Sequence, residues 1–147
     1  MRSAFRSELE FLSNFYPVEG GVEYEGDRYP CVENAFQAAK TLNPDERKPF
    51  EICGPARAKQ LGRKLGLRHD WDFARVDIMK QLVRYKFQHP DLREKLIATG
   101  DEPLEEANTW HDNYWGVCTC VRCHGKKFGL NWLGRILMSV RKELQQP

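Results

Sequence analysis

The chain has 147 residues, a length typical of one domain with a substantial hydrophobic core. Hydrophobic residues make up 41% and aromatic residues 12% of it, which excludes a disordered chain. A net charge of only +2 excludes a dedicated polyanion binder, although a local basic cleft is compatible with it.

The sequence favours a cytoplasmic protein without a membrane partner. It contains no long apolar run, and its first twelve residues alternate charged and apolar side chains, unlike a signal peptide. Of its five cysteines, three crowd into Cys118, Cys120 and Cys123, which is unlike a disulfide framework and fits a reducing compartment.

Short strands are expected first. Apolar pairs at residues 11–12 and 15–16 are strand-like, and residues 22–29 alternate around a turn at Gly26–Asp27. These patterns predict a small antiparallel sheet with one buried face. Residues 12–15, Leu-Ser-Asn-Phe, place polar side chains beside an exposed aromatic between strands, and a plain turn is the alternative interpretation.

Helical patterns dominate the rest of the chain. They predict helices over residues 31–40, 44–53, 55–65, 71–88, 90–99 and 130–145, with a short strand within 104–109. No internal repeat or linker divides the sequence. We therefore expect one domain over residues 1–147 of the α+β class, mostly helical with a small antiparallel sheet.

The helix predicted after Pro30 brings a carboxylate and an amine together. At about 100° per residue, Glu33, Gln37 and Lys40 form one stripe, beside an apolar stripe. Such a face is often only solvated, and that is the alternative interpretation.

Two further segments suit an anionic ligand. The helix over residues 55–65 carries a basic face that includes Arg63, although most such faces are merely hydrated. The helix that starts at Trp71 offers free backbone amides at its N-terminus, with Arg75 in its first two turns.

Residues 110–116, Trp-His-Asp-Asn-Tyr-Trp-Gly, pack three aromatics, an imidazole and a carboxylate into a predicted loop. Such a loop suits stacking on a planar ring and proton transfer, while a lid over the core is the alternative. Just beyond it, Cys118, Cys120, Cys123 and His124 offer four metal ligands in seven residues. Zinc sites normally combine two separated pairs, so we expect no metal and treat this set as the alternative.

An ordered set of motifs resembles the NADAR, or YbiA-like, family over nearly the whole chain. The motifs are Leu12-Ser13-Asn14-Phe15, residues 29–40, Leu61-Gly62-Arg63, residues 68–72 with Met79, residues 112–116, and residues 131–134 with Leu137, Met138 and Arg141. The resemblance implies an α+β, mostly helical fold and an N-glycosidase that cleaves the bond between ribose C1 and an amine.

The resemblance leaves two substrate classes. One branch of the family removes ADP-ribose from guanine in nucleic acid, and another hydrolyses ribosylamino-pyrimidine intermediates of riboflavin synthesis. The sequence departs from the riboflavin-linked pattern in the cysteine-containing loop after Trp115-Gly116, and Val117 stands where an Asp is common in the family. We expect ADP-ribosylated guanine, in nucleic acid or nucleotide, as the substrate, with an ADP-ribosyltransferase toxin as a functional counterpart.

Carried onto this chain, the family's motifs make Glu33, Lys40 and Asp112 the catalytic candidates. Our preferred hypothesis is that Lys40 forms an imine with C1 while Glu33 serves as acid and base, and direct hydrolysis is the rival. Neither route needs a cofactor. The substrate-binding candidates are Asn14, Phe15, Gln37, Arg63, Trp71, Arg75, Trp115, Gly116 and Asn131. The main alternative of another class is a zinc-stabilised module that binds nucleotides or nucleic acid.

Overall fold

The computed structural model describes residues 7–146, and the chain divides into two compact units. We name each unit after its main helix. The α1 unit comprises residues 14–88 and contains α1 (Val32–Ala38), while the α6 unit comprises residues 1–13 and 89–147 and contains α6 (Trp132–Gln145).

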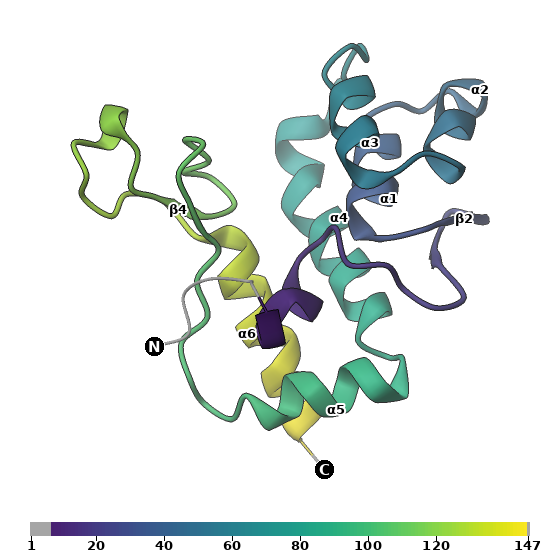
Figure 1. The fold of residues 1–147 in the computed structure, drawn as a ribbon. Coiled ribbons are helices and arrows are strands. Elements are labelled where there is room, and N and C mark those ends of the chain that lie inside the picture. The colour runs from purple at the N-terminus through teal and green to yellow at the C-terminus, as the bar shows by residue number, and fades with distance from the viewer. Residues whose placement is uncertain (1–6, 147) are drawn as a thin grey trace. The chain divides into compact units, whose positions relative to one another are not determined.

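Helix α1 is the centre of its unit. It lies among α3 (Pro55–Gly62), α4 (Trp71–Lys86) and a β-hairpin (Figure 1), and it also contacts the 3-10 helix η2 (Lys48–Glu51). All seven of its residues are buried. Its polar residues therefore lie inside the unit and need partners there. The solvated-surface alternative is wrong for this helix.

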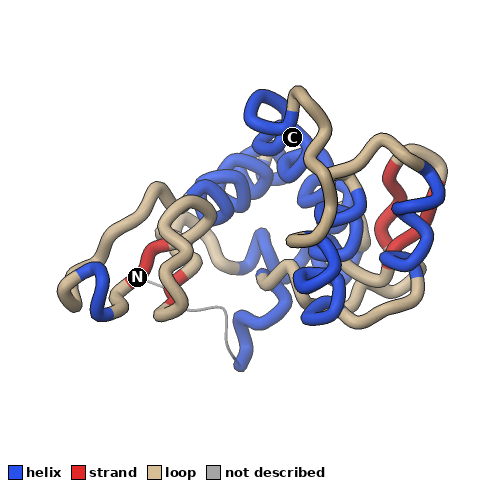
Figure 2. Tube along the Cα trace, turned by 90° about the horizontal axis from the view of Figure 1, so that it is seen from above, coloured by secondary structure: helices blue, strands red, loops and turns tan. Residues whose placement is uncertain are grey.

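The hairpin pairs β1 (Val22–Tyr24) with β2 (Asp27–Tyr29) in an antiparallel arrangement, which confirms the predicted sheet (Figure 2). Val22, Tyr24 and Tyr29 are buried, whereas the intervening Glu23 is exposed, as period-two alternation requires. The turn is Glu25–Gly26, one residue earlier than expected, and both residues have positive φ values of 47° and 91°.

The short helix α2 (Pro44–Arg47) begins where the sequence predicts. Asn43 Oδ1 accepts the backbone N–H of Asp45 at 2.9 Å, and Pro44 stands at the first helical position. The four later helices are shorter than expected, since α3 ends at Gly62, α4 at Lys86 and α5 (Pro90–Ala98) at Ala98, and α6 begins at Trp132.

In the α6 unit, α5 (Pro90–Ala98) packs on α6. The buried Arg141 donates to Thr99 Oγ1 at 2.9 Å and fastens the end of α5 to α6. The strand expected at residues 11–12 is wrong, because these residues end the 3-10 helix η1 (Ser7–Leu12), where Phe11 lies under the Lys95 ammonium at 5.8 Å.

A second pair of strands organises the long segment before α6. β3 (Ala107–Asn108) and β4 (Val117–Cys118) run parallel, and the 3-10 helix η3 (Val121–Cys123) follows. Gly116 permits their close approach, since a Cβ there would lie 2.2 Å from the Glu106 carbonyl oxygen. Within residues 7–146, no helix has the length and apolar character needed to span a bilayer.

Candidate active site

Glu33 presents a buried carboxylate in the first turn of α1, with 8% of its surface exposed. Its backbone N–H donates to the Asn14 carbonyl oxygen at 3.0 Å, which ties the residues before β1 to the start of the helix. Gln37 lies one turn later and donates from Nε2 to Glu33 Oε1 at 2.9 Å. This bond fixes the orientation of the Glu33 carboxylate, and contact of Gln37 with substrate stays a prediction.

Lys40 stands two residues beyond the end of α1, so the predicted helix over residues 31–40 is too long. The chain leaves the helix through a tight turn in which the Lys40 N–H donates to the Gln37 carbonyl oxygen at 3.2 Å. Lys40 is half-buried, and this burial lowers the pKa of its amine. The Glu33 carboxylate acts in the opposite direction, and the Arg63 and Lys59 cations add to the lowering.

Together these residues place an oriented carboxylate, an amine of reduced basicity and nearby cations in one unit. The carboxylate is suited to proton transfer, and the amine is suited to nucleophilic attack because it loses its proton more readily than an exposed lysine. The cations would favour an anionic substrate.

Gly62, for which the sequence predicted no role, leaves room for the Gln37 side chain. A Cβ on Gly62 would lie 1.9 Å from Gln37 Oε1, so a larger residue would fit only if the Gln37 side chain moved. That Oε1 atom is buried and accepts no hydrogen bond within residues 7–146. The signal was present in the Leu61-Gly62-Arg63 motif, since a glycine in a helix often marks a close approach.

Lys86 is a second amine that sequence reasoning missed. It is 1% exposed, and burial lowers its pKa to about 7. Its Nζ lies 5.7 Å from the centre of the Tyr16 ring and 5.1 Å from that of Phe87. The signal was its place at helical spacing from Met79 and Leu82, which puts a lysine on the core face of α4.

The other candidates of the α1 unit differ in what they offer a ligand. Phe15 is 39% exposed and has an accessible ring, whereas Trp71 is 6% exposed and packs against Phe36 with ring centres 5.0 Å apart. Arg63 is exposed at the end of α3, and Arg75 is half-buried in α4. Burial leaves little of the Trp71 ring for stacking on a substrate, although its role in binding stays a prediction.

Asp112 lies in the α6 unit and organises a turn. Its Oδ1 accepts the backbone N–H groups of Tyr114 at 3.2 Å and Trp115 at 3.0 Å. The buried Asn108 side chain holds the peptide groups of Asp112 on both sides, with bonds of 2.8 and 3.0 Å. The loop is therefore held by hydrogen bonds between side chains and backbone, instead of by burial of apolar residues.

The remaining three candidates belong to the same loop region. Trp115 is half-buried and meets Tyr114 edge to face at 4.9 Å. Asn131 directs its amide to the backbone, accepting from the Glu106 N–H at 3.0 Å and donating to the Leu104 carbonyl oxygen at 2.9 Å. Asn131 and the close-packed Gly116 thus build the loop, and their contact with substrate stays a prediction.

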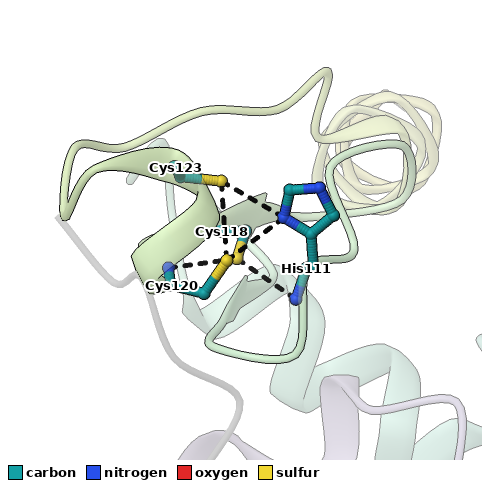
Figure 3. Close-up of side chains that lie close together, drawn as sticks. All are labelled: His111, Cys118, Cys120 and Cys123. Atoms are coloured by element: carbon teal, nitrogen blue, oxygen red, sulfur yellow. Dashed lines mark hydrogen bonds between the residues drawn. The ribbon is translucent and has the colours of Figure 1, made fainter.

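Four ligand atoms of the α6 unit gather in one place. The side chains of His111, Cys118, Cys120 and Cys123 converge, with their ligand atoms within 4.8 Å of one another (Figure 3). His124, expected beside these cysteines, is exposed and lies outside the group.

Comparison with known proteins identifies the relatives of this chain. A family model described as "NADAR domain" matches residues 4–145. N-glycosidase Npun_R5314 of Nostoc punctiforme is 36% identical over 141 residues, which covers 91% of this chain and 85% of that protein. N-glycosidase YbiA of Escherichia coli is 35% identical, covering 84% of this chain and 75% of YbiA. Riboflavin biosynthesis protein VVA0006 of Vibrio vulnificus is 39% identical over 92% of this chain, but over only 36% of its own length.

The fold agrees with these matches. The NMR structure of Escherichia coli YbiA superimposes with a TM-score of 0.76 at 31% identity, covering 98% of this chain and 86% of YbiA. The predicted α+β class is confirmed. This chain therefore belongs to the NADAR domain family, as the motifs in its sequence indicated.

Proposed function

We propose that this protein is an N-glycosidase that removes ADP-ribose from ADP-ribosylated guanine, in nucleic acid or nucleotide. The observation that carries the proposal is the pairing of Glu33, oriented by Gln37, with an amine at Lys40 whose pKa is lowered by burial. The N-glycosidase names of two relatives support the class of reaction.

The chemistry needs both groups. An amine leaves ribose C1 readily only after protonation, and its departure leaves positive charge on the sugar. A carboxylic acid can supply the proton, and a nucleophile can capture C1. Glu33 and Lys40 have the functional groups for these two tasks.

In the imine route, the bond between C1 and the ring oxygen breaks first. The ring oxygen takes a proton from Glu33, and the guanine nitrogen forms an iminium with C1. The neutral Lys40 amine then adds to C1, and its proton passes through Glu33 to the departing guanine amine. Water hydrolyses the resulting Lys40 imine, which frees the lysine and gives ADP-ribose that closes its ring again.

The surroundings of Lys40 support an anionic substrate. Arg63 and Lys59 lie close enough to influence the Lys40 pKa, so their charges also act on a ligand bound at this lysine. The diphosphate of ADP-ribose fits such a setting, and the exposed Arg63 guanidinium is suited to hold it.

A second substrate class has support from one relative. Riboflavin biosynthesis protein VVA0006 matches this chain, so ribosylamino-pyrimidine intermediates are the alternative substrate. The same bond type would be cleaved. Release of product from ADP-ribosylated guanine oligonucleotides and from the pyrimidine intermediates, measured side by side, separates the two classes, and we expect faster release of ADP-ribose.

Trapping tests the imine route. Sodium cyanoborohydride present during turnover should leave a ribose-containing adduct, which peptide mass spectrometry should locate on Lys40. Lys40→Arg should abolish activity, because an arginine forms no imine under these conditions. An active enzyme without any lysine adduct, or an active Lys40→Arg variant, favours direct hydrolysis; an adduct on Lys86 assigns the nucleophile to the other low-pKa amine.

A further inference from the structure

We propose that His111, Cys118, Cys120 and Cys123 bind one Zn²⁺ in a closed structural site within the α6 unit. The four side chains point toward a common centre, with their ligand atoms within 4.8 Å of one another (Figure 3). Three cysteines and one histidine are a ligand set typical of structural zinc.

Three distances among the ligand atoms lie close to the edges of a tetrahedron around zinc. Bonds of about 2.3 Å to sulfur and about 2.0 Å to nitrogen place neighbouring ligands about 3.5–3.8 Å apart. Cys120 Sγ and Cys123 Sγ are 3.8 Å apart, and His111 Nδ1 lies 3.5 Å from Cys123 Sγ and 3.1 Å from Cys120 Sγ. The two sulfurs are too far apart for a disulfide, and all three cysteines are free thiols.

Local structure explains how residues of such uneven spacing meet. Cys120 and Cys123 have the two-residue spacing common in zinc sites, and η3 turns them toward one another through a Cys123 N–H bond to the Cys120 carbonyl oxygen at 2.9 Å. Cys118 is the last residue of β4, and the loop between β3 and β4 places His111 beside Cys118.

Backbone N–H groups are already directed at one of the sulfurs. The N–H groups of His111 and Cys120 each donate to Cys118 Sγ at 3.2 Å. Donors of this kind stabilise a thiolate and orient a ligand sulfur, as outer partners do in known metal sites.

The segment around the cluster lacks an ordinary core. Three large apolar residues are exposed there, at fractions of 91% for Val121, 61% for Phe128 and 53% for Leu130, whereas Cys118 is fully buried. Burial of these three side chains therefore contributes little to holding this segment. A bound metal supplies the stabilisation that small apolar contacts cannot, as it does in small metal-dependent domains.

The site is closed and its role is structural. Four protein ligands occupy all four coordination positions of a tetrahedral zinc ion and leave none for a reactive water. His111 immediately precedes Asp112, so the ion would also fix one end of the turn that Asp112 organises. Zinc would thereby stabilise the loop without entering the glycosidase chemistry.

Metal analysis of the intact chain tests the proposal directly. The protein is produced in medium with added zinc, purified under reducing conditions, and analysed by mass spectrometry for zinc, iron, copper and nickel. We expect about one zinc per chain. The metal-free protein titrated with Co²⁺ should develop thiolate charge-transfer bands and the intense visible absorption of a tetrahedral ion. Absence of stoichiometric zinc together with an octahedral Co²⁺ spectrum would overturn the site.

Two histidine variants provide a matched comparison. His111→Asn removes the imidazole but keeps a residue that tolerates the left-handed backbone at this position, where φ is 66°. We expect its zinc affinity to fall at least about a hundredfold, the upper end of what a lost outer partner costs. His124→Asn, also at a positive φ of 56°, should retain full zinc affinity. Equal affinities in the two variants, or loss of zinc only in His124→Asn, would reject His111 as the ligand.

Discussion

The two units hold their polar side chains by different means. In the α1 unit, Glu33 and Gln37 come from a helix that is buried on every side, so burial and packing constrain them together with the bond between their side chains. In the α6 unit, Asp112 comes from an irregular loop, where it is held by bonds to backbone N–H groups. The α1 unit depends mainly on close packing and the exclusion of water, whereas the Asp112 loop of the α6 unit depends on individual hydrogen bonds.

The difference also affects what each region can do with charge. Burial lowers the pKa of Lys40 and of Lys86 in the α1 unit, because a charged amine is poorly solvated there. The α6 unit instead fixes the geometry of Asp112 and Trp115 through the loop. Substitutions in the α1 unit should therefore act through charge and volume, and those in the loop through the loss of single bonds.

The largest expected effect is on activity in Glu33→Gln. The substituted side chain can no longer serve as acid and base, so we expect the rate of bond cleavage to fall about a thousandfold. The melting temperature should stay close to that of the wild type, because the amide oxygen of the new side chain can still accept the Gln37 N–H bond. Glu23→Gln, at an exposed position of β1, is the matched control and should keep full activity. Comparable activity in both variants would remove Glu33 from the mechanism.

A pair of substitutions at Asp112 separates chemistry from loop structure. Asp112→Asn keeps an oxygen for the Tyr114 and Trp115 N–H bonds, so we expect near-normal stability and about a hundredfold loss of activity. Asp112→Ala removes these bonds as well and should lower the free energy of unfolding by about 1 kcal/mol. Activity assays and denaturant unfolding measure the two effects. Full activity in the asparagine variant would make Asp112 a residue of loop structure alone.

Much of the fold could be predicted from local patterns. The Asn43–Pro44 helix start, the hairpin and the amphipathic α6 all follow from rules that act within a few residues. The burial of helix α1 was harder to predict, because its polar stripe suggested a solvated face although the helix is buried on all sides. Its early end depends on a tight turn at residues 39–41, which leaves Lys40 outside the helix although the sequence predicted it inside.

The sites were predictable only in part. The sequence placed Glu33, Gln37 and Lys40 together because they are close along the chain. It could not pair His111 with the cysteines, since that meeting requires the parallel strands β3 and β4, whose short length gives no periodic signal. The role of Gly62 depends on a contact between two helices, α1 and α3; a glycine inside the predicted helix indicates a close approach but does not identify Gln37 as the neighbour.

Lys86→Met should change how stability depends on pH. The pKa of Lys86 falls from 10.5 to about 7 on folding, so between these values the unfolded chain binds more protons and the free energy of unfolding rises with pH. Below about pH 7, Lys86 is protonated in both states, and its lowered pKa then destabilises the folded protein by the full amount.

Between about pH 7 and pH 9, the wild type should therefore gain about 2 kcal/mol relative to the methionine variant. The neighbouring Cys31 thiol, whose pKa is raised by burial, is present in both proteins, so its own titration largely cancels in the comparison. Denaturant unfolding of both proteins at the two pH values measures the difference. Equal pH dependence in the two proteins would mean that Lys86 does not titrate in this range.

Gly62→Ala tests whether the space beside Gln37 controls the orientation of Glu33. The added Cβ would lie 1.9 Å from Gln37 Oε1 and 2.7 Å from its Cδ, so the Gln37 side chain must move and loosen its bond to Glu33. We expect about a tenfold loss of activity, within the range that a misplaced catalytic group causes. Gly66→Ala is the matched control, because nothing lies within 4 Å of a Cβ there. If the alanine at residue 62 raises stability through helix propensity and leaves activity unchanged, Gln37 is not the group that orients Glu33, and the carboxylate must be positioned by the packing of α1 itself.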